Sequence, residues 1–190
     1  TLISSDFVGV LCDEWRRRGH GQAVFVNGAL GAMISPHVKQ RNMDGVTDFG
    51  LTACDLCEAA LDHSELMPVD AIEVRRADVY LPMVAAAFRI GRLTTALQRD
   101  VFSGAARTSV GYLRMGAFEA VAIPGEMFVE YQLEIKHRIA QDTGKSAIVI
   151  GYANDYIGYI ITPRADKTGG YEKAISRVAP SAGRTLTEAA

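Results

Sequence analysis

Stretches with the period of a helix alternate along this chain with short apolar stretches that suit strands, and this alternation limits the possible folds more than any other feature. Apolar residues recur at helical spacing in three stretches, residues 5–18, 44–63 and 127–143. Runs of β-branched and aliphatic residues predict strands at 23–26, 72–81 and 147–151, and a β-rich stretch at 108–123 in two pieces around Gly116. The strand at 23–26 is expected to lead into a glycine-rich turn at 27–31, of a kind that often faces a site. Such alternation favours an α/β layered fold, with a mixed β-sheet flanked by helices.

Capping and turn residues mark where these elements begin and end. Ser4 and Ser5 suit the start of the first helix, and Gly19 and Gly144 suit the ends of the first and last helices. The second helix is expected to bury one face, made of Val46, Phe49, Ala53, Cys57 and Ala60. The last helix is expected to turn Met127, Tyr131, Ile135 and Ile139 inward. The stretch 84–109 has no clean period and is predicted to be loop and short helix.

Composition sets the broad class of the protein. The chain has 190 residues, and 48% of them are hydrophobic, which is enough apolar material for one core. Its formal net charge is -2. No run of five basic residues occurs, so a nucleic-acid interface is not expected. The densest basic cluster, residues 16–18, is interpreted as complementing a helix dipole. No apolar stretch is long enough to predict a membrane span.

Glu126 is the first candidate for a functional residue. It follows Pro124 and Gly125 at a predicted strand-to-helix junction, where a carboxylate gains from the positive end of the helix dipole. A carboxylate in that position suits a metal ligand. The alternative that Glu126 only starts its helix stays open.

Tyrosines gather in the last third of the chain. Four of the seven tyrosines fall within twenty residues, at positions 152, 156, 159 and 171. A phenol can bind a metal, donate a proton or stabilise an oxyanion, and aromatic clusters also form cores. The cluster alone leaves these alternatives open.

The order of these motifs resembles the end of the catalytic domain in the neutral (neutral/alkaline, non-lysosomal) ceramidase family. The family motifs are P-G-E, G-x-x-N-x-Y-x-x-Y and Y-E. Their counterparts here are Pro124-Gly125-Glu126, the segment from Gly151 to Tyr159, and Tyr171-Glu172. The resemblance implies a zinc-dependent amidohydrolase that cleaves the amide bond of an N-acylated lipid, such as ceramide, to a fatty acid and an amine (sphingosine).

The resemblance also implies roles for single residues. Glu126 and Tyr159 correspond to ligands of the catalytic Zn²⁺, and Tyr171 corresponds to a tyrosine that contacts the scissile amide. Residues 3–6 resemble the family's V-S-S-D-N segment, and 25–36 takes the place of its S-N-x-G-D-V-S-P-N segment. This second match gives Ser35 a role beside the substrate.

Two departures from the family pattern shape these expectations. Residues 31–37 lack the family's Asp and Asn and carry one extra residue before Ser35, so an enzyme acting on a different amide stays open. The family's two zinc-binding histidines lie upstream of the segment matched by 3–6, and none of the four histidines here matches them. Because catalytic zinc usually needs three protein ligands, we expect this chain alone not to assemble the site.

We therefore expect residues 1–190 to be the C-terminal part of a neutral ceramidase-like catalytic domain. An N-terminal part, or a second chain, is expected to supply the two histidines, and a first residue Thr1 rather than Met agrees with a missing upstream part. The resemblance alone favours a secreted or periplasmic protein. A second hypothesis is a non-catalytic family relative that binds a lipid or a partner. The pair Cys54 and Cys57 is interpreted as helix packing.

Overall fold

The computed structural model describes most of the chain, namely residues 3–34, 36–37, 40–84 and 101–190. Its contacts divide the chain into two compact units. The first unit comprises Thr1–Val26 and Ile34–Leu66, and the second comprises Asn27–Met33 and Met67–Ala190. None of the described helices is long and apolar enough to cross a membrane.

The first unit is a pair of helices, α1 (Asp6–Arg17) and α2 (Met43–Leu61). The two helices approach closely at Gly50, where an added Cβ would lie 2.6 Å from the Cβ of Val10. The residues of α2 that are buried are Gly45, Gly50 and Cys54. The predicted apolar face of α2 was therefore wrong at Cys57 and Ala60, which are exposed, because the contact forms around the small residues that permit a close approach.

Arg18 links the two helices of this unit. Its guanidinium lies 2.8 Å from Glu14 on its own helix, and 2.7 Å from Asp55 and 2.6 Å from Glu58 on α2. The arginine cluster was expected to complement the dipole of α1. The structure adds an interhelical ion-pair network to that role.

This network predicts that the first unit is sensitive to acid. Hydrogen bonds from Arg17 and Arg18 hold the pKa of Glu14 at about 2, below its usual 4.5. The folded state therefore favours the charged carboxylate, which stabilises the unit above pH 4.5, and this stabilisation is lost as the pH falls through about 2. We expect Glu14→Gln to lower stability at neutral pH and to have little effect near pH 2.

Urea unfolding followed by the fluorescence of Trp15, the single tryptophan, measures this effect because Trp15 lies in α1. The difference between wild type and Glu14→Gln should shrink between pH 4.5 and 2. A difference that stays constant across this range contradicts the prediction.

The predicted strand at 23–26 is absent from the structure. These residues form an irregular segment in which the side chain of Val24 is 85% exposed. An apolar run becomes a strand only where a neighbouring strand accepts its backbone hydrogen bonds, and none of the described residues provides that partner here.

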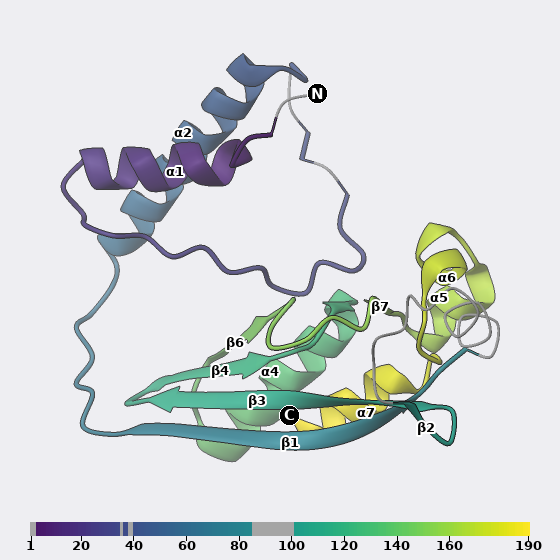
Figure 1. Ribbon diagram of the computed structural model, residues 1–190. Helices are drawn as coiled ribbons and strands as arrows, with labels where there is room; N and C mark the ends of the chain where they lie inside the picture. The colour runs from purple at the N-terminus through teal and green to yellow at the C-terminus, as the bar shows by residue number, and fades with distance from the viewer. Residues whose placement is uncertain (1–2, 35, 38–39, 85–100) are drawn as a thin grey trace. The chain divides into compact units, whose positions relative to one another are not determined.

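The second unit is built on a mixed sheet, which confirms the predicted fold class (Figure 1). The strand order is β1-β3-β4-β6, and β2 pairs with β3. Pairs β1–β3 and β3–β4 are antiparallel, and β4–β6 is parallel. The strands are β1 (Ile72–Pro82), β2 (Val101–Phe102), β3 (Ala105–Met115), β4 (Phe118–Ala122) and β6 (Ala147–Ile150).

The strand bounds test two further expectations. Gly116, with φ of 57°, separates β3 from β4, which confirms the predicted break. The loop and short helix predicted for 84–109 are wrong at β2 and at the start of β3, which both lie within that stretch. Residues 85–100 of that stretch lie outside the described residues.

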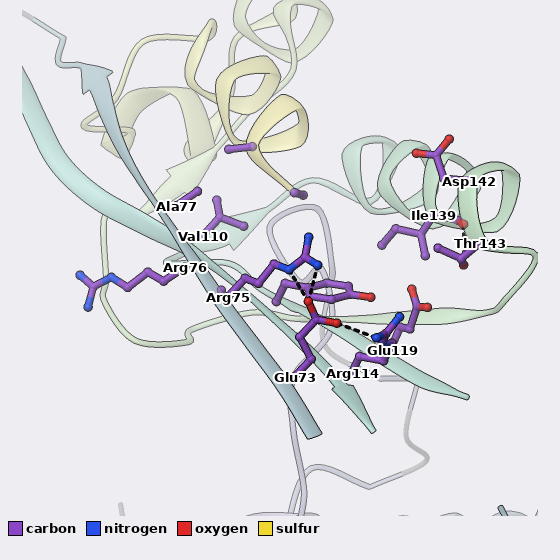
Figure 2. A pocket seen from close by; sticks show the side chains of 14 residues that line it. Glu73, Arg75, Arg76, Ala77, Val110, Arg114, Glu119, Ile139, Asp142 and Thr143 are labelled. Carbon is purple, nitrogen blue, oxygen red and sulfur yellow. Dashed lines mark hydrogen bonds and ion pairs between the residues drawn. The ribbon is translucent and has the colours of Figure 1, made fainter. Parts of the chain in front are cut away.

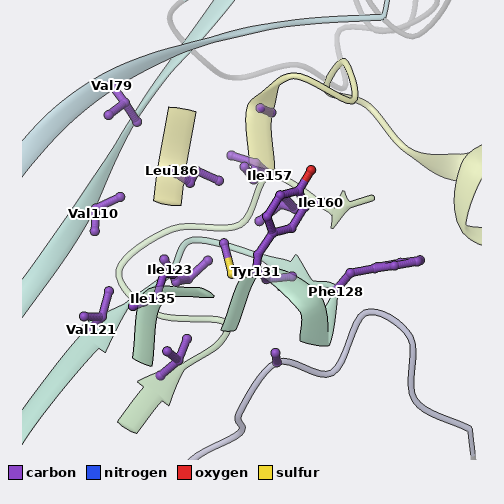
Figure 3. Packing of buried hydrophobic residues seen from close by; sticks show 14 of the residues in the cluster. Val79, Val110, Val121, Ile123, Phe128, Tyr131, Ile135, Ile157, Ile160 and Leu186 are labelled. Carbon is purple, nitrogen blue, oxygen red and sulfur yellow. The ribbon is translucent and has the colours of Figure 1, made fainter. Parts of the chain in front are cut away.

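Helices α4 (Val129–Thr143) and α7 (Ala182–Ala189) cover one face of the sheet. α4 packs on β6, α7 packs on β1, and the two helices contact each other. Figure 3 shows the core between these layers, with side chains from strands, helices and connecting segments: Val79, Val110, Val121, Ile123, Ile135 and Leu186. The short helices α5 (Pro163–Thr168) and α6 (Tyr171–Ile175) follow the last strand.

Candidate active site

The two predicted metal ligands meet at the end of the parallel strand pair. Because β4 and β6 run in the same direction, the segments that follow them leave the sheet at the same edge. There they pair again as a two-stranded parallel sheet, β5 (Glu126–Met127) with β7 (Tyr159–Ile160). Glu126 is the register partner of Tyr159, so residues far apart in sequence become neighbours.

Close packing explains why the middle position of the P-G-E motif is a glycine. An added Cβ on Gly125 would lie 2.5 Å from the carbonyl oxygen of Gly158, so a larger residue would push the two segments apart. The Glu126 amide then donates to that same carbonyl at 3.0 Å, and the Phe128 amide donates to Ile160 at 3.1 Å.

Glu126 does not start the helix. Helix α4 begins at Val129, and Glu126 and Met127 form the short strand β5, so the expected strand-to-helix junction lies three residues later. Met127 was assigned to the inner face of the helix and instead is buried as a strand residue. The carboxylate of Glu126 is therefore positioned by sheet pairing, with 6% of the residue exposed.

Three phenols surround this carboxylate. The Tyr156 hydroxyl donates to Oε1 of Glu126 at 2.7 Å. The hydrogen bond between Tyr159 and Glu126 is the main cause that raises the pKa of Tyr159 to about 12. Burial, followed by the charge and hydrogen bond of Glu126, raises the pKa of Tyr152 to about 12. At neutral pH these side chains are neutral donors to a carboxylate acceptor.

Tyr171 lies beside this group. Its ring centroid is 6.1 Å from that of Tyr159 in an edge-to-face arrangement, and its side chain is 66% exposed. Tyr152 and Tyr156 form a second ring pair at 5.7 Å. The structure thus gathers all four tyrosines of the predicted cluster near Glu126.

The loop that carries Tyr152 and Tyr156 is strained and firmly anchored. Tyr152 and Asn154 have φ of 53° and 66°, values that residues with side chains rarely adopt. The Tyr152 and Ile157 amides donate to the P-G-E segment, to Gly125 and Pro124. Thr108 on β3 also donates to Asp155, at 2.7 Å. Anchored strain of this kind is typical of functional loops.

Sequence reasoning placed Tyr152 and Tyr156 in the cluster and gave them no role. The structure shows that they contact the Glu126 carboxylate. Their four-residue spacing in a glycine-flanked loop was the available signal, and it could not show which way the loop turns.

The predicted glycine-rich turn lies against the same strand. The Gly31 amide donates to the Met127 carbonyl at 2.9 Å, and the Gly151 amide donates to the Asn27 carbonyl at 2.8 Å. Segment Asn27–Met33 therefore belongs to the second unit and borders β5. Ser35, the predicted substrate-side residue, lies outside the described residues.

The donor atoms present fit part of a zinc site. Glu126 and Tyr159 are adjacent oxygen donors, and zinc accepts oxygen ligands beside imidazole. In the described ranges Glu126 has phenols but no cation as partner, so its charge is available to a metal ion. Those ranges contain no group of three His, Cys, Asp or Glu residues that could hold a metal.

Comparisons with known proteins bear on the fold. No protein-family model and no curated protein sequence matches the chain. The similar solved structures include a neutral ceramidase from Pseudomonas aeruginosa, with a TM-score of 0.75 and 15% identity, and a ceramidase complexed with C2, with a TM-score of 0.74 and 16% identity. Each match covers 98% of this chain and only 40% and 41% of those chains.

The resemblance inferred from the motifs is thus confirmed at the level of the fold. The chain has the fold of part of a neutral ceramidase and spans about two fifths of the length of the solved ceramidases. At 15% and 16% identity, activity and metal dependence do not follow from the fold.

Proposed function

We propose that this chain is the C-terminal part of the catalytic domain of a zinc-dependent amidohydrolase. The proposed reaction is hydrolysis of the amide bond of an N-acylated lipid such as ceramide, giving a fatty acid and an amine such as sphingosine. The observation that supports it is the pairing of Glu126 with Tyr159 in adjacent strands, with Tyr171 alongside. These are the three residues to which the motif resemblance gives roles.

Each residue has a distinct task in this proposal. Glu126 and Tyr159 hold the metal, and Tyr152 and Tyr156 orient the Glu126 carboxylate by hydrogen bonds. Tyr171 is exposed beside them and can donate its hydroxyl hydrogen to the substrate amide. Zinc, when bound, supplies Lewis-acid activation of water and of the carbonyl group. Ser35 stays a candidate for a contact with the substrate.

Two histidine ligands complete the proposed site. We propose that they come from an N-terminal part of a longer polypeptide or from a second chain, since catalytic zinc usually has three or more protein ligands. Zinc analysis of residues 1–190 alone, and of these residues with the preceding sequence, tests this idea. We expect near-stoichiometric zinc only in the longer protein, and its loss in Glu126→Ala.

The outcome also separates the two functional hypotheses. Zinc accompanied by metal-dependent release of fatty acid from an N-acylated lipid supports the amidohydrolase. Absence of zinc from both proteins overturns the metal mechanism and leaves the non-catalytic lipid- or partner-binding relative.

Tyr156→Phe is expected to weaken zinc binding by about tenfold in the longer protein, because the Glu126 carboxylate loses one of the donors that fix its orientation. Competition with a chelating indicator measures the affinity. Tyr80→Phe, at an exposed tyrosine of β1, is the matched control and should bind zinc as wild type does. Equal affinities for Tyr156→Phe and wild type contradict the positioning role.

A further inference from the structure

A pocket lies away from the tyrosine cluster, between the helix-covered face of the sheet and the ends of α4 and α7. Its volume is about 510 Å³, and strands β1, β3 and β4 contribute most of its wall. Figure 2 shows Glu119 of β4 in this wall, near Arg114. Asp142 and Thr143, at the end of α4, also line it.

Glu119 is the unusual member of this pocket. The residue is 1% exposed, and neither carboxylate oxygen has a hydrogen bond of normal geometry among the described residues. Tyr112 is the nearby polar group: burial first, then the Glu119 charge and a weak hydrogen-bonding contact with Glu119, raise the pKa of its phenol. A buried carboxylate without a full set of donors is costly, so its retention calls for a ligand or partner.

The cations of the pocket are already engaged elsewhere. Arg114 is the cross-strand neighbour of Glu119 and pairs with Glu73 at 2.8 Å. Arg75 also pairs with Glu73, and Arg76 pairs with Asp78 at 3.3 Å.

Two carboxylates are therefore left over in the pocket. Within the part of the chain that the structure describes, neither Glu119 nor Asp142 has an ion pair. Both line the same cavity, whose wall holds three arginines, Arg75, Arg76 and Arg114, and three acids, Glu73, Glu119 and Asp142, so two unpaired acids lie in a wall of balanced charge.

The remaining wall suits a hydrocarbon stem. Ala77, Val110 and Ile139 line the same cavity, so apolar surface lies beside the two carboxylates. A ligand that satisfies both features has a short alkyl stem and a cationic end with several N–H donors.

We propose that this pocket binds an alkylammonium or alkylguanidinium group, with its cationic end on Glu119. The site is independent of the proposed zinc site. The cation has two possible sources, a free small amine or a lysine or arginine side chain from another part of the same polypeptide. Both Glu119 oxygens are shielded in this structure, so entry of the ligand requires a side chain to move, and Arg114 is half exposed and long enough to do so.

Titration of the 190-residue chain with n-butylammonium, followed by the amide NMR signals of Val110 and Thr143, tests the site. We expect saturable shifts, and about tenfold weaker binding in Glu119→Gln, since a charge-assisted hydrogen bond is lost. Glu134→Gln, an exposed position on α4 outside the pocket, should bind as wild type does. Tetramethylammonium, which has no N–H donor, should give no saturable shift.

The results that overturn the proposal are specific. They are the absence of saturable shifts, equal binding by wild type and Glu119→Gln, or an experimental structure in which Arg114 leaves Glu73 to pair with Glu119. Asp142→Asn gives a second test at an exposed position and should also weaken binding.

The longer protein distinguishes the two sources of the cation. If a side chain of the same polypeptide fills the pocket, butylammonium binds the longer protein at least about tenfold more weakly than the 190-residue chain. Equal binding by both indicates a free amine. The zinc experiment plays no part in this test, so failure of the proposed enzyme function would leave it unaffected.

Discussion

Glu126→Gln is expected to remove zinc and hydrolytic activity together from a protein that contains the two proposed histidine ligands. The amide keeps the shape of the side chain and the pairing of β5 with β7, while the charge that attracts the metal is lost. Loss of an outer-shell partner costs about 10- to 100-fold, so loss of a ligand should lower kcat/KM by more than about a hundredfold. Zinc analysis and fatty acid release from an N-acylated lipid, measured on the same sample, check both effects.

The control for this variant is Glu130→Gln, four residues along the chain. Glu130 is exposed in the first turn of α4, so the same chemical change there should leave zinc content and activity as in wild type. Full zinc content in Glu126→Gln would remove Glu126 from the ligand set.

A shared site for Glu126, Tyr159 and Tyr171 could be expected from the sequence because the order of the three motifs resembles that of the neutral ceramidase family. What the motifs could not show is the mechanism of convergence. A parallel pair of strands, β4 and β6, brings the two segments to one edge of the sheet, and a second parallel pairing sets their register. Pairing between distant segments leaves no local pattern in the sequence.

The errors have a common physical cause. The expected strand at 23–26 lacks a partner strand, and the expected buried Cys57 gives way to the close approach at Gly50. Both depend on contacts between segments, which periodicity cannot supply. Predictions that depend on one segment, such as the buried face of Tyr131, Ile135 and Ile139, were confirmed. So was the end of α4 at Gly144.

The glycine-rich turn at 27–31 could be recognised from its own composition, but its role depends on a contact with another segment. Its composition marked it as a turn beside a site, and the structure shows why one glycine is required. An added Cβ at Gly31 would lie 2.2 Å from the carbonyl oxygen of Glu126 and 3.0 Å from the carbonyl carbon of Met127. These are backbone atoms of β5, which cannot move aside as a flexible side chain can.

Gly31→Ala is therefore expected to push segment Asn27–Met33 away from β5 and to destabilise the second unit by about 3 kcal/mol, the upper range for overpacking. Amide exchange of Glu126 and Phe128, whose hydrogen bonds close the β5–β7 pair, measures the effect locally. Gly28→Ala is the matched control, because its added Cβ comes closest to the flexible Gln132 side chain, at 3.2 Å, and lies at an ordinary contact distance of 3.8 Å from the Val149 carbonyl oxygen. If the Glu126 and Phe128 amides exchange at the same rate in both variants, the close packing of Gly31 on Glu126 does not hold β5 in place.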